Sequence, residues 1–172
     1  LEKMSALVIA LADHKKTLAR RVFKAPDGTI MRPTINVGGM FSSGEGGKIN
    51  TVPALAQFTL DRRVLAVETV AKVESELRRF LATAAKKIPQ CKISITKISD
   101  NHPCFNPPTH PFFTAMAETL KRVRKKSSTY QVSSGFNDMH FFSHQLKIPT
   151  LGYGPGGDDI HAIDERARIK EL

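Results

Sequence analysis

The sequence has few cysteines, no tryptophan and no long apolar run. Its 172 residues include two cysteines, Cys91 and Cys104. Two cysteines cannot form a disulfide scaffold, so we expect reduced thiols in a cytoplasmic protein, although one bridge between them stays open. No apolar run approaches the roughly 20 residues that a membrane-spanning helix needs, and no signal-peptide pattern opens the chain. The sequence therefore predicts neither a disulfide-rich secreted scaffold nor a membrane partner.

The sequence has fewer acidic than basic residues. The 26 lysines and arginines exceed the 16 aspartates and glutamates, for a net charge of +10. Such an excess permits nucleic-acid binding, but base stacking needs aromatic rings among the cations, and only Tyr130 follows a basic cluster. The clusters fall late in expected helices, where cations complement the helix dipole. We interpret them as solvated helix ends and expect no nucleic-acid partner.

The spacing of apolar residues predicts a mixed α/β chain. Helical periodicity predicts helices over residues 3–24, 67–87, 113–123 and 137–146. Alternation with a period of two predicts strands over residues 34–41, 49–65, 91–96 and 148–153. In the strand over 49–65, Phe58 and Leu60 lie on the apolar face, and the polar face ends in Asp61 and Arg63.

The order of these elements indicates two segments. Residues 1–100 follow a split βαβ pattern without its first strand. The proline-rich stretch over 100–111 is the expected domain boundary. Residues 110–160 are typical of the closing helix and strand pairs of an open α/β sheet, whose ligands bind in loops at the carboxyl ends of strands.

Acidic residues surround one histidine near the end of the sequence: Asp158, Asp159, His161, Asp164 and Glu165. A neutral imidazole near carboxylates suits a divalent metal or a general base, whereas solvated loop residues are the alternative. Catalytic zinc usually has three protein ligands. His140 and His144, one helical turn apart, could also chelate a metal, although partly buried polar histidines are the simpler interpretation.

Arg63 and Asn50 are candidate ligands for a substrate carboxylate. Arginine offers a bidentate fork of donors, and asparagine offers an amide donor. The alternative for Arg63 is a surface ion pair with Asp61, two residues earlier.

These residues fall in patterns that resemble a known family. Gly38-Gly39, Asn50-Thr51-Val52-Pro53 and Asp61-Arg62-Arg63 resemble the lid, or dimerisation, domain of the zinc aminoacylase and carboxypeptidase family, which includes acetylornithine deacetylase and succinyl-diaminopimelate desuccinylase. Ser134-Gly135-Phe136-Asn137-Asp138 resembles its glycine-rich loop, and Ile148 to Pro155 with His161 resembles its last metal-ligand segment. The resemblance covers essentially the whole chain in the right order.

The resemblance implies a metal-dependent amidohydrolase that cleaves N-acyl amino acids or small peptides. Family members use two zinc ions, or sometimes cobalt or manganese, with a glutamate as general base. By similarity, His161 matches a terminal metal ligand, Asn50 and Arg63 match residues that hold the substrate, and Gly135 matches a loop that contacts the substrate backbone. His140 stands where the family often has arginine, which leaves the substrate open.

The resemblance also implies the fold and the partners. Residues 1–100 are expected to form a ferredoxin-like lid that lacks its first strand, and residues 101–172 the C-terminal part of the catalytic domain. The family's other metal ligands and its general base precede the lid, and this sequence starts at Leu1. We therefore expect a fragment that is inactive alone, without catalytic residues of its own, and that pairs with the missing N-terminal segment and forms a homodimer through the lid. The alternative is a non-catalytic dimerisation or assembly module, and a basic nucleic-acid binder is third.

Overall fold

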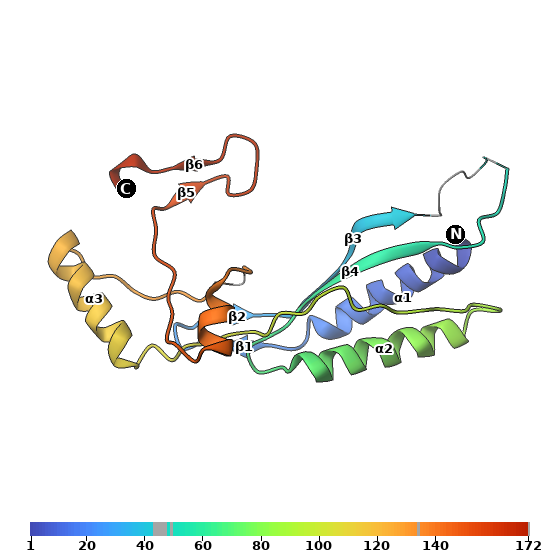
Figure 1. The fold of residues 1–172 in the computed structure, drawn as a ribbon, viewed down its shortest axis with the longest axis horizontal. Coiled ribbons are helices and arrows are strands. Elements are labelled where there is room, and N and C mark those ends of the chain that lie inside the picture. Colours follow the sequence, from blue (N-terminus) through green and yellow to red (C-terminus); the bar gives the residue numbers. More distant parts are fainter. Residues whose placement is uncertain (43–47, 49, 134, 172) are drawn as a thin grey trace. The chain divides into compact units, whose positions relative to one another are not determined.

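The computed structural model describes residues 1–42, 48, 50–133 and 135–171. Ser134 of the family resemblance, and residue 49 at the start of the strand expected over 49–65, therefore lie outside the described part. The chain forms two compact units, Leu1–Phe105 with Thr129–Phe136, and Asn106–Ser128 with Asn137–Leu172. Helices and three two-stranded antiparallel sheets make up these units (Figure 1), so the predicted mixture of helix and strand is confirmed. The domain boundary predicted after residue 100 stays a prediction.

The core of the first unit lies between two helices and a hairpin. Helices α1 (Glu2–Leu18) and α2 (Val70–Lys86) lie beside strands β3 (Thr34–Ser42) and β4 (Gln57–Arg63) (Figure 1). One buried cluster contains residues of α1, β3 and α2, namely Leu11, Leu18, Ile35 and Leu81. Partly buried residues of β3, β4 and α2 pack against this cluster. Both helices therefore cover the same face of the hairpin.

The first helix is shorter than its periodicity predicts. It ends at Leu18, not at residue 24, and Val22 is half exposed. The chain instead enters the small hairpin of β1 (Phe23–Lys24) and β2 (Ile30–Met31). Strand pairing between Phe23 and Met31 thus overrides the continuing helical spacing.

A bulge interrupts the pairing of β3 with β4. Val37 pairs with Leu60 and Phe41 pairs with Phe58, so three residues of β3 lie opposite Thr59 alone. The Thr59 hydroxyl donates to the Gly38 carbonyl and accepts from the Met40 N–H at 3.1 Å. Gly39 has a φ of +80°, a region that residues with a Cβ rarely adopt. The bulge is therefore held by one side chain and one glycine.

Two of the predicted strands of this unit are corrected. The strand expected over 49–65 begins at Gln57, beyond Pro53, whose ring cannot donate to a ladder. The strand expected over 91–96 forms no ladder within the described residues. Its backbone contacts go to α2 instead, because Arg78 of that helix donates to the Ile95 carbonyl at 2.9 Å. Alternation of apolar residues indicates an extended segment, but it does not supply the neighbouring strand that a ladder needs.

The second unit contains helix α3 (Pro111–Arg124). A π-helical turn, η1 (Phe141–Gln145), replaces the helix predicted over 137–146. The strand predicted over 148–153 is absent from the described chain, where the Asn106 side chain donates to the Thr150 carbonyl at 3.0 Å. The unit ends in β5 (Gly157–Asp158), β6 (Arg166–Ala167) and the 3-10 turn η2 (Ile169–Glu171). No helix in the described residues is long and apolar enough to cross a membrane.

Candidate functional site

The polar face of the β3–β4 hairpin contains a hollow beside Arg63. Its volume is about 280 Å³, and it is lined by Met31, Arg32, Thr34, Asn36, Arg63, Val64 and Leu65. The strand register explains the lining. Thr34 pairs with Arg63, and residues paired directly across an antiparallel ladder point to the same face. The polar row of β4 predicted from the sequence thus lies opposite the helix-covered face, because Phe58 and Leu60 pack against the core.

Arg63 lies at the edge of this hollow beside the Asp61 carboxylate. Its Nε is 3.5 Å from the Asp61 Oδ2, and the two side chains are 50% and 65% exposed. The pair expected from the sequence is therefore present, but the guanidinium stays half exposed to solvent. A surface pair of this kind contributes about 0–1 kcal/mol, so a ligand carboxylate could replace Asp61 at small cost.

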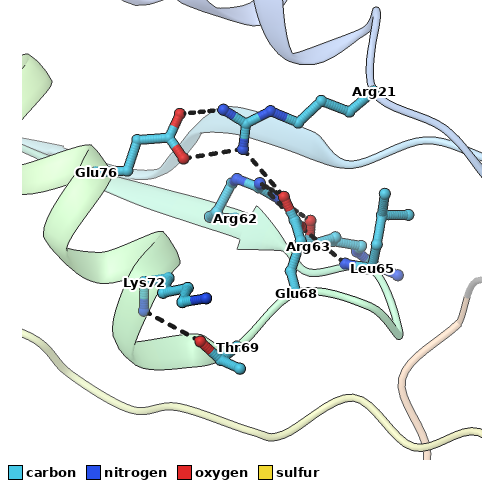
Figure 2. Close-up of polar contacts among 8 residues, drawn as sticks. All are labelled: Arg21, Arg62, Arg63, Leu65, Glu68, Thr69, Lys72 and Glu76. Atoms are coloured by element: carbon cyan, nitrogen blue, oxygen red, sulfur yellow. Dashed lines mark hydrogen bonds and ion pairs between the residues drawn. The ribbon is translucent and has the colours of Figure 1, made fainter.

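The preceding residue, Arg62, points to the opposite face and is nearly buried. Its side chain is 8% exposed and faces the Glu68 carboxylate, with N–O distances of 3.1 and 3.2 Å (Figure 2). Arg62 also donates to the carbonyl of Arg63. The backbone of the candidate ligand residue is thus tied directly to a buried guanidinium.

Glu68 joins this contact to the segment just after α1 and to the turn after β4. Its carboxylate accepts from Arg21 at 3.1 Å and from the Leu65 N–H at 3.0 Å (Figure 2). Arg21 also binds Glu76 of α2 through both of its terminal nitrogens. The hydrogen bond from Arg21 lowers the pKa of Glu76 and outweighs the opposing effect of burial. We call Arg21, Arg62, Glu68 and Glu76 the ion-pair network.

Asn50 lies at the other end of the hairpin. The β3–β4 connection that contains it leaves the ladder at the pair Ser42–Gln57, and Arg63 pairs with Thr34 at the opposite end. Arg63 lies six positions after Gln57 along β4, which corresponds to roughly 20 Å at the usual rise of a strand. Asn50 itself is exposed, in a turn where the Thr51 N–H donates to the Lys48 carbonyl at 3.0 Å.

Gly135 lies in the segment 129–136, which belongs to the first unit although it follows α3 in the sequence. The Gly135 N–H donates to the Ser133 hydroxyl at 3.1 Å, and a Cβ at this position would lie 3.2 Å from the same oxygen. The segment is bound to the β1–β2 turn, because the Val132 N–H donates to the Asp27 carboxylate at 3.1 Å. Hydrogen bonds from Thr29, and then from Val132, lower the pKa of Asp27.

His161 lies in the second unit, in the loop between β5 and β6. It is exposed and has a φ of +64°, and its N–H donates to the Glu165 carboxylate at 3.3 Å. The other acidic residues of the loop are engaged separately. Asp158 forms an ion pair with Arg168 at 3.3 Å. The carboxylates of this loop are therefore close to His161 in sequence, but their side chains do not converge on a common point.

The described residues do not by themselves fit a metal ion. Among them, no three side chains of histidine, cysteine, aspartate or glutamate converge as a metal centre requires. Of the expected histidine pair, His140 is buried at 5% exposure, with its Nδ1 2.8 Å from the Asn137 carbonyl. This position matches the structural interpretation of His140. Both cysteines are free thiols, and burial raises the pKa of Cys104.

Sequence reasoning missed two parts of this region. The sequence does contain a signal for the ion-pair network. Because Arg63 lies on the polar face of β4, the adjacent Arg62 must lie on the apolar face, where a cation needs a charged partner. The partner of Arg62 is Glu68, six residues later, which the turn after β4 brings back to the strand. Arg32 had no such signal, because it precedes β3 and lines the hollow only through the course of the chain around Pro33.

Comparison with known proteins identifies a matching family model and several relatives. A family model described as peptidase family M20/M25/M40 matches residues 6–172. A succinyl-diaminopimelate desuccinylase of Methylobacterium nodulans is 26% identical over 123 residues, which cover 72% of this chain and 30% of the relative. The enzyme of the same name from Helicobacter pylori strain G27 is 24% identical over 127 residues, or 73% of this chain and 30% of the relative. The chain thus spans about 30% of the length of these relatives. No solved structure gives a significant match.

Proposed function

The chain belongs to peptidase family M20/M25/M40, and on this premise we propose that it is part of a metal-dependent amidohydrolase that cleaves N-acyl amino acids or small peptides. The observation that carries the proposal is the match of the family model to nearly the whole chain. The relatives' names point to the desuccinylase branch of this chemistry. Members of the family are hydrolases and are generally metal-dependent.

We propose that Arg63 binds a carboxylate of the substrate. Its guanidinium is half exposed and lies at a hollow, and a planar fork of donors matches a carboxylate better than any other side chain. Asn50 and Gly135 are proposed to contact the same substrate through an amide donor and an exposed backbone.

We propose His161 as one ligand of the metal centre, whose other ligands lie outside these 172 residues. When bound, the metal would lower the pKa of a water that attacks the amide. The proposal is supported by the match of the family model, which includes His161, and by the short span of the chain relative to its relatives. Zinc or cobalt suits a site with an imidazole ligand.

The lid assignment and the homodimer are also proposals. The antiparallel β3–β4 hairpin, with α1 and α2 on one face, supports a ferredoxin-like lid in the first unit. Asn50 and Arg63 lie at opposite ends of that hairpin. If both contact one small substrate, a second copy would have to supply one of them. This separation supports a homodimer through the lid.

The test compares hydrolysis of N-succinyl and N-acetyl amino acids by the native protein that contains this chain and by the 172-residue chain alone, each with zinc or cobalt added. We expect metal-dependent turnover by the native protein and none by the chain alone. In the native protein, Arg63→Ala should lower kcat/KM roughly ten- to a hundredfold through a lost charge-assisted hydrogen bond, and His161→Ala should lower the bound metal measured by atomic absorption.

Arg20→Ala is the matched control, because Arg20 is an exposed arginine of the same unit that does not line the hollow. Turnover that persists after the metal is removed would contradict the proposal. If the native protein has no hydrolase activity and yet dimerises, the non-catalytic assembly module becomes the better interpretation. Clear turnover by the chain alone would show that it is not an inactive fragment.

A further inference from the structure

The turn between β1 and β2 contains a carboxylate, that of Asp27, which the proposed function does not use. Pro26 precedes it, and Gly28, with a φ of +86°, follows it. The Gly28 N–H donates to the Ala25 carbonyl at 2.9 Å, and the Ala25 N–H donates to the Thr29 carbonyl at 2.8 Å. A glycine adopts this φ without a steric cost. These contacts fix the backbone on both sides of Asp27.

The two carboxylate oxygens of Asp27 have different partners. Oδ1 accepts from the Thr29 N–H at 2.9 Å, the usual contact of an aspartate with the backbone two residues later. Oδ2 accepts from the Thr29 hydroxyl at 2.9 Å and from the Val132 N–H at 3.1 Å. Thr29 thus orients the carboxylate, and Oδ2 binds a backbone N–H that is 105 positions away in sequence.

Residues 129–133 lie against the first unit on one side. They follow α3 in the sequence but belong to the first unit. Tyr130 and Val132 are half-buried, whereas the residues between and beside them are exposed. Burial that alternates with a period of two is typical of an extended chain with one side on the protein. We call residues 129–133 the docked segment, which contacts Asp27 through the Val132 N–H.

Gly135 follows the docked segment by two positions. Its N–H donates to the hydroxyl of Ser133, the residue next to Val132, at 3.1 Å. Three positions of chain span at most roughly 11 Å between Cα atoms, so Gly135 lies within that distance of Val132. Binding of Val132 by Asp27 therefore confines Gly135 to a small part of the first unit.

From these contacts we infer that Asp27 is a positioning residue, which binds the backbone of the docked segment and thereby holds Gly135 in place for the substrate. The inference rests on the proposed contact between Gly135 and the substrate, and it adds the residue that fixes this contact. A carboxylate suits the role because its two oxygens accept hydrogen bonds from several directions, and because a charged acceptor strengthens each of them.

An NMR titration of the 172-residue chain tests the docking. The amide proton shifts of Thr29 and Val132 should change together as Asp27 binds a proton. The midpoint should lie below the ordinary pKa of 3.8, because hydrogen bonds from Thr29, and then from Val132, lower the pKa of Asp27. A Val132 N–H that is bound to water would not follow this titration.

Two variants separate the turn from the docking at about pH 7. Asp27→Asn keeps one oxygen for the Thr29 N–H and replaces the other by an NH2 group, which cannot accept a hydrogen bond. We expect the Val132 shift to change and the Thr29 shift to stay. Asp27→Ala removes both acceptors and should change both shifts, so it decides the result if the asparagine oxygen turns to Val132 instead.

Kinetics of the native protein that contains this chain test the positioning role. Asp27→Asn should raise the KM for an N-succinyl or N-acetyl amino acid roughly three- to tenfold, the effect of one exposed hydrogen bond. The kcat should stay nearly unchanged, because a contact made equally in the ground and transition states affects KM alone. Loss of folded protein would instead lower kcat at constant KM. Asp13→Asn, an exposed aspartate paired with Lys16, is the matched control and should change neither.

A double variant shows whether Asp27 acts through Gly135. Gly135→Ala should raise KM by itself, because the added Cβ would crowd the substrate and lie 3.2 Å from the Ser133 hydroxyl. Adding Asp27→Asn to Gly135→Ala should raise KM no further, since the effects of residues that act through one another are not additive.

Three results would overturn the inference: a Val132 shift that is the same in both Asp27 variants as in the unchanged chain, an unchanged KM in both variants, or additive effects in the double variant. Failure of the proposed function gives a different result. If Gly135→Ala leaves KM unchanged, or if the native protein hydrolyses neither substrate, the proposed contact of Gly135 is wrong. The Val132 shift still decides whether Asp27 holds the docked segment.

Discussion

Arg62 and Arg63 are adjacent in β4 and have opposite surroundings. Arg62 is almost buried in the ion-pair network, whereas Arg63 is half exposed at the hollow. The alternation of strand side chains fixes this difference, since successive residues point to opposite faces. Arg62 also donates to the Arg63 carbonyl. The buried cation therefore fixes the strand end from which the exposed cation reaches a ligand.

Loss of the negative charge of Glu68 should destabilise the first unit. Glu68→Gln keeps the shape but leaves Arg62, 8% exposed, without its ion partner. We expect a loss of roughly 1–3 kcal/mol, because a buried cation without a counter-charge carries its desolvation cost. The measurement is hydrogen exchange of buried α2 amides. Asp13→Asn is the control, because the Lys16–Asp13 pair is 78% and 74% exposed, so its loss should change stability far less than Glu68→Gln does. Equal effects of both changes would contradict this assignment of the network.

His14 predicts how the stability of this unit depends on pH. Its ring stacks on Phe80 with centroids 4.2 Å apart. Burial lowers its pKa below the ordinary value of 6.5, and Arg21 and Arg62 lower it further while Glu76 opposes them. The unfolded chain therefore binds the proton more readily than the folded chain. Well above pH 6.5 the ring is neutral in both states, and the folded state loses stability as the pH falls through the range around 6.5 and below.

The variant His14→Phe keeps an aromatic ring on Phe80 and removes the titrating group. Its free energy of unfolding, measured by urea at about pH 7.5 and about pH 5.5, should decrease less with acidification than that of the unchanged chain. The acid sensitivity contributed by Glu76 lies lower, below its ordinary value of 4.5, and does not overlap this window. If both proteins lose equal stability over the interval, His14 is not the group responsible.

At the scale of elements, the bulge in β3 depends on Gly39. Gly39→Ala places a Cβ at a φ of +80° and 3.1 Å from the Thr59 hydroxyl, the group that holds the bulge. We expect a loss of about 1–2 kcal/mol in urea unfolding. Gly38→Ala is the matched control, because a Cβ there meets nothing within 4 Å and its φ is not positive. A bulge of no structural importance would give the same small effect for both variants.

The elements that the sequence predicts well are those whose signal is local. The apolar stripe that contains Val73, Leu81 and Ala84 places α2 within three residues of its ends, and the alternation around Phe58 and Leu60 identifies both faces of β4. The segments over 91–96 and 148–153 show the same alternation and are not strands in the described chain. A ladder depends on a partner distant in sequence, which alternation within one segment does not reveal.

The same division applies to the candidate site. Arg63 could be identified from the sequence because it ends the polar face of a strand and falls in a family pattern. Both features lie within a few residues of it and indicate a carboxylate-binding role. Arg32 lies 31 positions away and reaches the hollow only because Thr34 pairs with Arg63. The register of a hairpin depends on its connection and its bulge, and neither could be derived from residue types alone. The place of Arg32 in the lining of the hollow therefore required the structure.

At the scale of the whole molecule, the open sheet edges and the net charge act in opposite directions on self-association. The described β3–β4 sheet has two strands, and strands at sheet edges present backbone groups that pair readily with another chain. The net charge of +10 repels a second copy at low salt. We therefore expect the proposed homodimer to be favoured when salt screens these charges.

Light scattering after size exclusion tests this expectation at about 0.05 M and about 0.3 M salt, where the screening length falls from roughly 14 Å to roughly 6 Å. At the higher salt and micromolar concentration, the mass should be twice the 19.0 kDa of one chain, constant over a roughly tenfold dilution, with more monomer at low salt. A mass of one chain under both conditions would contradict the dimer.

A mass that rises continuously with concentration would instead indicate association without a defined interface. The exposed apolar side chains, among them Ile163 at 91% and Ile169 at 84%, could cause such association. A closed symmetric pair has a fixed stoichiometry, so a constant doubled mass is the result that distinguishes a specific homodimer from association through apolar surface.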